Sequence, residues 1–165
     1  MSFVCSVCGE THEGLPAWVA AKPDPWFGLT EDEQRRAKCD ENLCDTRDGH
    51  FFVRAVLQLP LAEGPEPSFE FGVWGSLSED NFKRYTENFQ RRDRSKLGWM
   101  FSYLSNELPG FPGTRGLKAH LHPQDNLQRP LMELEPTDHP LAIAQREGIP
   151  FAKALEIIHP DESKP

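Results

Sequence analysis

Two long stretches in the middle of the chain alternate apolar and polar residues with the period of two that is expected of a β-strand. The first stretch has its apolar side chains at Phe51, Val53, Ala55, Leu57 and Leu59, and Pro60 ends it. The second has Phe69, Phe71, Val73, Gly75 and Leu77 in the equivalent positions. Because Gly64, Pro65 and Pro67 lie between the two stretches, the pattern predicts a β-hairpin with one apolar face.

A second hairpin is predicted between residues 117–122 and 131–135. Leu117, Ala119 and Leu121 alternate with Lys118, His120 and His122, and Met132 and Leu134 alternate with Glu133 and Glu135. Pro123 and Pro130 bracket the connecting loop. If His122 faces Leu131, then His120 faces Glu133 and Lys118 faces Glu135. This register puts the apolar groups on one face and opposite charges on the other.

Helices are predicted around these strands from capping residues and apolar spacing. Thr30 and Glu33 have the form of a capping box, which predicts a short helix through about Lys38. Ser78 begins a helix with apolar residues at Phe82, Tyr85 and Phe89. Two further helices are expected, one capped by Asp138 and beginning at His139-Pro140 and one opened by Pro150, with an apolar stripe at Phe151, Ala154, Leu155 and Ile158. The fold class expected is α+β, an antiparallel sheet of about four strands with helices on one face.

The length of 165 residues fits a single domain, residues 1–165. Within it, residues 1–49 form a cysteine-bearing, zinc-knuckle-like segment, and residues 50–160 form the α+β core. The N-terminus has no basic segment followed by an apolar run, and no stretch approaches the ~18 apolar residues of a membrane helix. We therefore expect a cytoplasmic protein without a membrane partner, whose four cysteines are metal ligands or thiols rather than disulfides.

The formal net charge of −8 disfavours nucleic acid as a partner, because nucleic-acid affinity depends largely on cations that neutralise phosphates. One basic run exists at Arg91, Arg92, Arg94 and Lys96, and Asp93 interrupts it. This pattern is more typical of a solvated helix end than of a nucleic-acid-binding patch.

The strongest chemical signal is Cys5-Ser6-Val7-Cys8-Gly9. A Cys-x-x-Cys-Gly turn lets two thiolates bind one metal ion, and zinc bound tetrahedrally needs two more ligands. His12, Cys39 and Cys44 are the candidates for these positions. A redox-active pair and thiols without a metal are the alternatives, but the motif lacks the βαβ context of thioredoxin-like sites.

Several stretches resemble an uncharacterised bacterial family, the domain-of-unknown-function family 2199. The resemblance begins with the run from Phe3 to Pro16 and includes His50 to Arg54, Phe71 to Ser78, Gly98 to Pro112 and Arg129 to Ile149. The family implies no activity, but it bears on the metal site: Cys5, Cys8, His12 and Cys44 fall where the family pattern has them, whereas Cys39 falls where another residue is usual. The resemblance therefore favours His12 over Cys39 as the fourth zinc ligand. The chain departs from the family at Gly75, where a larger β-forming residue is more usual.

Two other groups of polar residues are candidates for ligand binding or catalysis. Glu135, Asp138 and His139 lie at a predicted strand-to-helix turn, where helix capping is the simpler interpretation. His120 and His122 lie on one strand face beside Glu133, and Arg54 and Trp74 are expected on the same polar face of the sheet. Such a Trp indicates either a covered sheet face or a binding surface.

The sequence favours a non-enzymatic binding or protein-interaction module, with a structural zinc that braces the N-terminal segment and an unknown protein or small ligand as partner. A small hydrolase-like enzyme that uses the histidines and carboxylates is the alternative. The chain contains no P-loop, no dinucleotide-binding glycine pattern, no G-x-S-x-G and no H-E-x-x-H. Because residues 1–49 have few periodic apolar runs, removal of zinc is expected to unfold them before the sheet.

Overall fold

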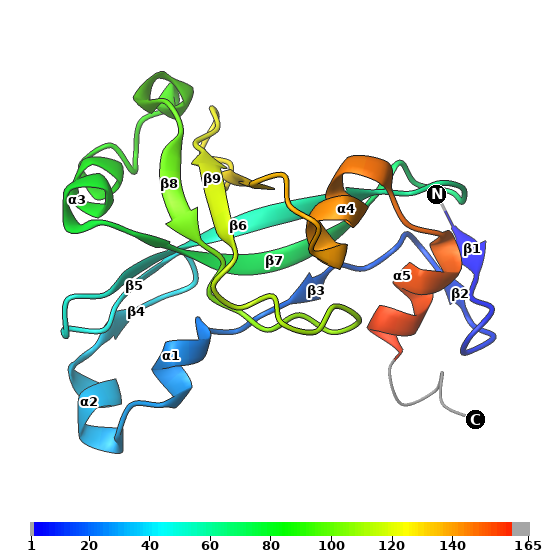
Figure 1. Ribbon diagram of the computed structural model, residues 1–165, viewed down its shortest axis with the longest axis horizontal. Helices are drawn as coiled ribbons and strands as arrows, with labels where there is room; N and C mark the ends of the chain where they lie inside the picture. The colour runs from blue at the N-terminus through cyan, green and yellow to red at the C-terminus, as the bar shows by residue number, and fades with distance from the viewer. Residues whose placement is uncertain (1, 160–165) are drawn as a thin grey trace.

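The centre of the fold is a long β-hairpin, seen here in a computed structural model that describes residues 2–159 (Figure 1). Position 1 and positions 160–165 of the predicted domain lie outside the described residues. Strands β6 (Phe51–Pro60) and β7 (Ser68–Leu77) pair antiparallel over their full length of 10 residues. The predicted apolar face is buried, with Ala55, Leu57 and Phe71 at 0% exposure, which confirms this hairpin.

The second predicted hairpin is also confirmed. Strands β9 (Lys118–His122) and β10 (Leu131–Leu134) pair antiparallel with His122 opposite Leu131 and His120 opposite Glu133. The backbone N–H of Glu135 donates to the carbonyl of Lys118 at 3.0 Å, so the predicted register continues to the end of the hairpin.

The sheet as a whole differs from the expected four antiparallel strands. It is a mixed sheet of eight strands, with the order β3-β7-β6-β10-β9-β8, and β5 pairs with both β6 and β4. The additional strands are β3 (Trp18–Val19), β4 (Lys38–Cys39), β5 (Leu43–Asp45) and β8 (Met100–Tyr103). Two pairings, β3 with β7 and β6 with β10, are parallel. Strands of two to four residues show little periodic pattern, and parallel neighbours are distant in sequence, so local patterns did not reveal them.

The sheet curls until the β8 end approaches β7. Leu104 forms an isolated antiparallel bridge with Gly75, and the N–H of Ser105 donates to the carbonyl of Trp74 at 2.8 Å. A Cβ atom at position 75 would lie 2.5 Å from Oγ of Ser102 and 2.9 Å from Cε of Met132. In this chain, glycine at position 75 is therefore what allows three strands to converge inside the curl.

The helices lie where sequence capping signals place them, with two differences. Thr30 and Glu33 make the predicted capping box of α2 (Glu31–Arg36), and Ser78 caps α3 (Glu79–Glu87). The helix α4 (Pro140–Glu147) is capped by His139 rather than Asp138, because the imidazole Nδ1 accepts the N–H of Leu141. A further helix, α1 (Asp24–Phe27), was not expected, whereas α5 (Phe151–Ile158) was. The 3-10 helix η1 spans Arg94–Leu97.

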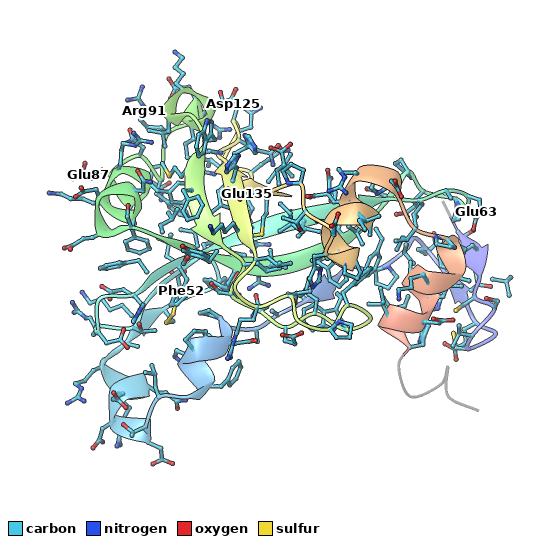
Figure 2. All side chains as sticks on the ribbon, in the orientation of Figure 1. Phe52, Glu63, Glu87, Arg91, Asp125 and Glu135 are labelled. Carbon is cyan, nitrogen blue, oxygen red and sulfur yellow. A yellow bond between two sulfur atoms is a disulfide. The ribbon has the colours of Figure 1, made fainter. Side chains whose placement is uncertain are left out.

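The face of the β6–β7 hairpin opposite the main core is covered as well. Phe52 and Trp74 form a second apolar cluster with Ala20 and Cys44, and Trp26 of α1 packs against it. Trp74 is 0% exposed, and its indole N–H donates to the carbonyl of Ala20 at 3.1 Å. Phe52 lies on the side of the sheet toward α1 (Figure 2). The expectation that helices lie on one face only was therefore wrong, because the large aromatic side chains on the second face also require cover.

A separate two-stranded sheet of β1 (Phe3–Val4) and β2 (Thr11–His12) lies beside α5, at the opposite end of the molecule from β4 and β5 (Figure 1). The N–H of Phe151 donates to a carboxylate oxygen of Glu63 at 3.0 Å, and Glu63 lies near this end (Figure 2). No helix within residues 2–159 has the length and apolar character needed to cross a membrane.

Replacement of Gly75 by valine is expected to lower the free energy of unfolding by about 1–3 kcal/mol, the usual range for overpacking a core. The physical reason is the lack of space between Ser102 and Met132. Urea unfolding followed by tryptophan fluorescence measures the change. Gly28→Ala is the matched control, because Gly28 has a φ of −85° and the nearest atom to a new Cβ is 3.5 Å away. Equal stability of Gly75→Val and the unaltered protein would contradict the convergence described at β7.

Candidate functional site

Two cysteines and two histidines come together at the end of the molecule formed by β1, β2 and α5. One ligand atom from each of Cys5, Cys8, His12 and His159 lies within 4.8 Å of all the others. Within residues 2–159, this is the one cluster of at least three cysteine, histidine or acidic side chains whose ligand atoms are close enough to hold a metal ion.

The Cys-x-x-Cys turn is shaped by backbone hydrogen bonds between β1 and β2. The N–H of Gly9 donates to the carbonyl of Cys5 at 2.9 Å, and the N–H of Cys5 donates to the carbonyl of Glu10 at 2.8 Å. Gly9 has a φ of +78°, a conformation that glycine adopts without strain. The tight turn therefore brings the two sulfur atoms within 4.8 Å of each other.

His159 is brought to this turn by the packing of α5 against β1 and β2. The ring of Phe3 meets the ring of Phe151 edge to face, with their centroids 5.2 Å apart. The ring of Phe3 lies 5.4 Å from that of His12, which lies 5.6 Å from that of His159. Aromatic packing thus places a histidine near the C-terminal end beside ligands near the N-terminal end.

The four side chains fit zinc. Tetrahedral zinc with sulfur at ~2.3 Å and nitrogen at ~2.0 Å needs ligand atoms about 3.3–3.8 Å apart. The Sγ of Cys8 lies 3.3 Å from Nε2 of His12, and all four ligand atoms lie within 4.8 Å of one another. Cys5 is 1% exposed, so the protein itself shields one side of the cluster from water.

Of the predicted zinc ligands, Cys5, Cys8 and His12 lie together in this cluster, whereas Cys44 does not. Cys44, and Cys39 as its alternative, form a disulfide with each other. They are directly opposite each other in the β4–β5 pair, with Cα atoms 4.0 Å apart, and they lie far from β1 and β2 (Figure 1). His159 occupies the remaining position. The only sequence signal for His159 is its place directly after an amphipathic helix that must pack somewhere.

The predicted polar face of the second hairpin is present and forms a hollow of about 530 Å³. The Nε2 of His122 lies 3.2 Å from a carboxylate oxygen of Glu133, and the Nε2 of His120 lies 3.8 Å from one of Glu135. The side chains thus pair diagonally, whereas the backbone pairs His120 with Glu133. Glu135 lies between β9 and α4 in Figure 2 and belongs to this face.

The turn before α4 has a structural role. The Nδ1 of His139 accepts the N–H of Leu141 at 3.0 Å, and its Nε2 lies 3.1 Å from the carbonyl of Pro112. Because Nδ1 accepts, Nε2 must carry the proton and donate, so both ring nitrogens hold the backbone in place. Asp138 is exposed beside it and does not cap the helix.

Arg54 and Trp74 are neighbours, as expected, but Trp74 is fully buried rather than exposed on the sheet face. The guanidinium of Arg54 lies over the indole ring, 5.4 Å from its centroid, and the covered indole contacts no solvent. Arg54 instead lines a separate small hollow with Arg94 and Arg129. Burial and then the charge of Arg129 lower the pKa of Arg54, while Glu41 acts weakly in the other direction.

Three exposed aromatic residues next to the polar hairpin face were missed in the sequence. Trp99, Phe101 and Tyr103 are 56%, 38% and 45% exposed. Phe101 lies opposite His120 and Tyr103 opposite Lys118, while the ring of Trp99 stacks on that of His120 at 4.1 Å. The alternation of Phe101 and Tyr103 around the buried Ser102 is the signal that could have identified them.

Comparison with known proteins gives the chain a family. No curated protein and no solved structure matches it. The sequence pattern of one family, described as "Uncharacterized protein conserved in bacteria (DUF2199)", matches residues 4–149. The match includes Cys5, Cys8 and His12 and ends before α5 and His159. Because it covers most of the 165 residues, the chain belongs to this family of uncharacterised bacterial proteins.

Proposed function

We propose that this protein is a non-enzymatic protein-interaction module that is braced by one structural zinc ion. Cys5, Cys8, His12 and His159 bind the zinc, and the outer face of β8, β9 and β10 binds the partner. The observation that carries the binding role is the row of exposed aromatic side chains, Trp99, Phe101 and Tyr103, beside the paired histidines and glutamates.

The donor set supports a structural rather than a catalytic metal. Two cysteines and two histidines complete a tetrahedral zinc sphere, whereas catalytic zinc keeps one position for water or substrate. The ligands come from both ends of the described chain, so a bound ion connects β1 and β2 to α5. Two pairs of aromatic rings, Phe3 with Phe151 and His12 with His159, connect these segments less strongly than metal–ligand bonds do.

The chemistry of the outer face supports a protein partner. Aromatic residues are enriched at protein interfaces, where they contribute large contact areas with few rotatable bonds. The carboxylates of Glu133 and Glu135, together with the net charge of −8, favour a partner surface that combines apolar and basic groups.

The hydrolase-like alternative has weaker support on the same face. Among the described residues that line the hollow beside His120 and His122, there is no serine, threonine or cysteine to serve as a nucleophile. His139 is occupied by two backbone contacts. The His122–Glu133 pair is open to solvent on the sheet surface, which is a poor setting for covalent catalysis.

Protein purified without added metal is expected to contain about one zinc per chain, as measured by elemental analysis. His159→Gln and Cys5→Ser are each expected to reduce this content severalfold, because each removes one of the four ligands. The double variant Cys39→Ser/Cys44→Ser is the matched control and is expected to keep its zinc. Zinc that survives in His159→Gln but disappears in the double variant would contradict the assigned ligand set.

Removal of zinc by a chelator is expected to expose β1, β2 and α5 to hydrogen exchange first. The reason is that the ion joins these segments, whereas residues 38–45 are held by their disulfide and by pairing with β6. Hydrogen exchange monitored by mass spectrometry measures the protection of each segment. Loss of protection that spreads over β6 and β7 at the same rate would show that the metal stabilises the whole fold instead.

A photo-crosslinking amino acid in place of Tyr103 is expected to capture a defined partner in extract of the source cells. The same amino acid in place of Phe27, which is 61% exposed on α1, is the control and should not capture it. Excess unaltered protein should compete for the partner, and a Trp99→Ser/Phe101→Ser variant should not. Equal crosslinking from both positions would contradict the proposed face, and crosslinking only to a second copy of the chain would replace the partner with a homodimer.

A further inference from the structure

Three arginines converge on one small hollow of about 170 Å³. Arg54 comes from β6, Arg94 from η1, and Arg129 from the loop that precedes β10. Asn42 and Tyr85 also line the hollow. The three positions lie far apart in the sequence, so only the fold brings them together.

Within residues 2–159, none of the ion pairs includes any of these arginines, and Glu41 acts on Arg54 only beyond ion-pair distance. Arg94 is only 3% exposed, and its Nη1 and Nη2 donate to the carbonyls of Phe89 and Gln128 at 3.1 and 2.7 Å. Its Nε, like that of Arg54, is buried without a hydrogen-bond partner. Arg129 donates through Nε to the amide oxygen of Asn42 at 3.1 Å. All these acceptors are neutral.

Without an anion this arrangement is unfavourable for Arg94, which is buried, and for Arg54, which is half-buried, while Arg129 is exposed. Buried charges in proteins are normally paired, because desolvation and mutual repulsion otherwise destabilise them. Two nearby cations, Arg91 and Lys96, have the usual arrangement, since both form ion pairs with Asp93 on the surface. Among the described residues, Arg54, Arg94 and Arg129 have no such partner, although the chain has an excess of acidic residues. A bound anion would supply the missing negative charge.

We propose that this hollow is a binding site for a small oxyanion, the phosphate or carboxylate group of a ligand. Guanidinium groups bind both kinds of group through paired N–H donors, and all three arginines line the hollow. Burial raises the pKa of Tyr85, while Arg94 and Arg129 oppose the shift, so its hydroxyl keeps its proton as an additional donor. The site is separate from the zinc cluster and does not depend on the partner-binding face.

The test is an NMR titration of the full-length protein with inorganic phosphate and, separately, with sodium acetate, at constant ionic strength because salt screens such contacts. We expect saturable shifts of the Nε–H resonances of Arg54 and Arg94. Arg54→Gln and Arg129→Gln are each expected to weaken the Kd about tenfold or more, because each removes a charge-assisted hydrogen bond. Arg91→Gln is the matched control and should leave the Kd unchanged, because Arg91 is paired with Asp93 outside the hollow.

The two anions identify the source of the oxyanion. Tighter binding of phosphate assigns a phosphoryl ligand, and tighter binding of acetate assigns a carboxylate. A change at the more buried Arg54 can disturb folding, and the dispersion of the NMR spectrum reveals whether it does. Arg129 is exposed, so Arg129→Gln tests the site even in that case. Absence of saturable binding of either anion up to about 50 mM, or an equal loss of affinity in Arg91→Gln and Arg129→Gln, would overturn the proposal.

Discussion

The pairing of β6 with β7 is the interaction on which the rest of the structure depends. Both strands carry large apolar side chains on both faces, with Leu57 and Phe71 on one face and Phe52 and Trp74 on the other. A two-stranded ribbon is marginal in water, so each face needs cover. The first face is covered by the curl of the sheet and by the C-terminal helices. The second is covered in part by the chain that precedes β6.

The need to cover the second face explains the course of the N-terminal segment. Residues 1–49 look uniform in sequence, but the structure distributes the described part, residues 2–49, over three places. Strands β1 and β2 pack with α5, residues 18–28 lie against Trp74, and residues 38–45 extend the edge of the sheet. The segment has no core of its own, and cross-links hold two of its parts: the disulfide in β4–β5 and, as we propose, zinc at β1–β2.

The part of the second face that remains open carries the polar chemistry. Arg54, Val56 and Gln58 of β6 continue the surface formed by His120, His122 and Glu133, and adjoining hollows follow one another along it. The charges are unevenly distributed: histidines face glutamates at one end, while arginines without a carboxylate gather at the other. Both proposed binding regions therefore result from incomplete cover of a single sheet face.

The sequence by itself determined the features that depend on neighbouring residues. Alternation in residues 51–59 and 69–77 predicted the long hairpin, charge and apolar matching fixed the register of β9 with β10, and Thr30 and Ser78 set two helix starts. The tertiary structure alone decided the parallel pairings, the burial of Trp74, the arginine hollow and the choice of His159 over Cys44 in the metal cluster. The alternation of a strand and the capping of a helix depend on residues that are close in sequence, so the sequence shows them directly. A set of metal ligands or a covered sheet face depends on which distant segments meet when the core forms.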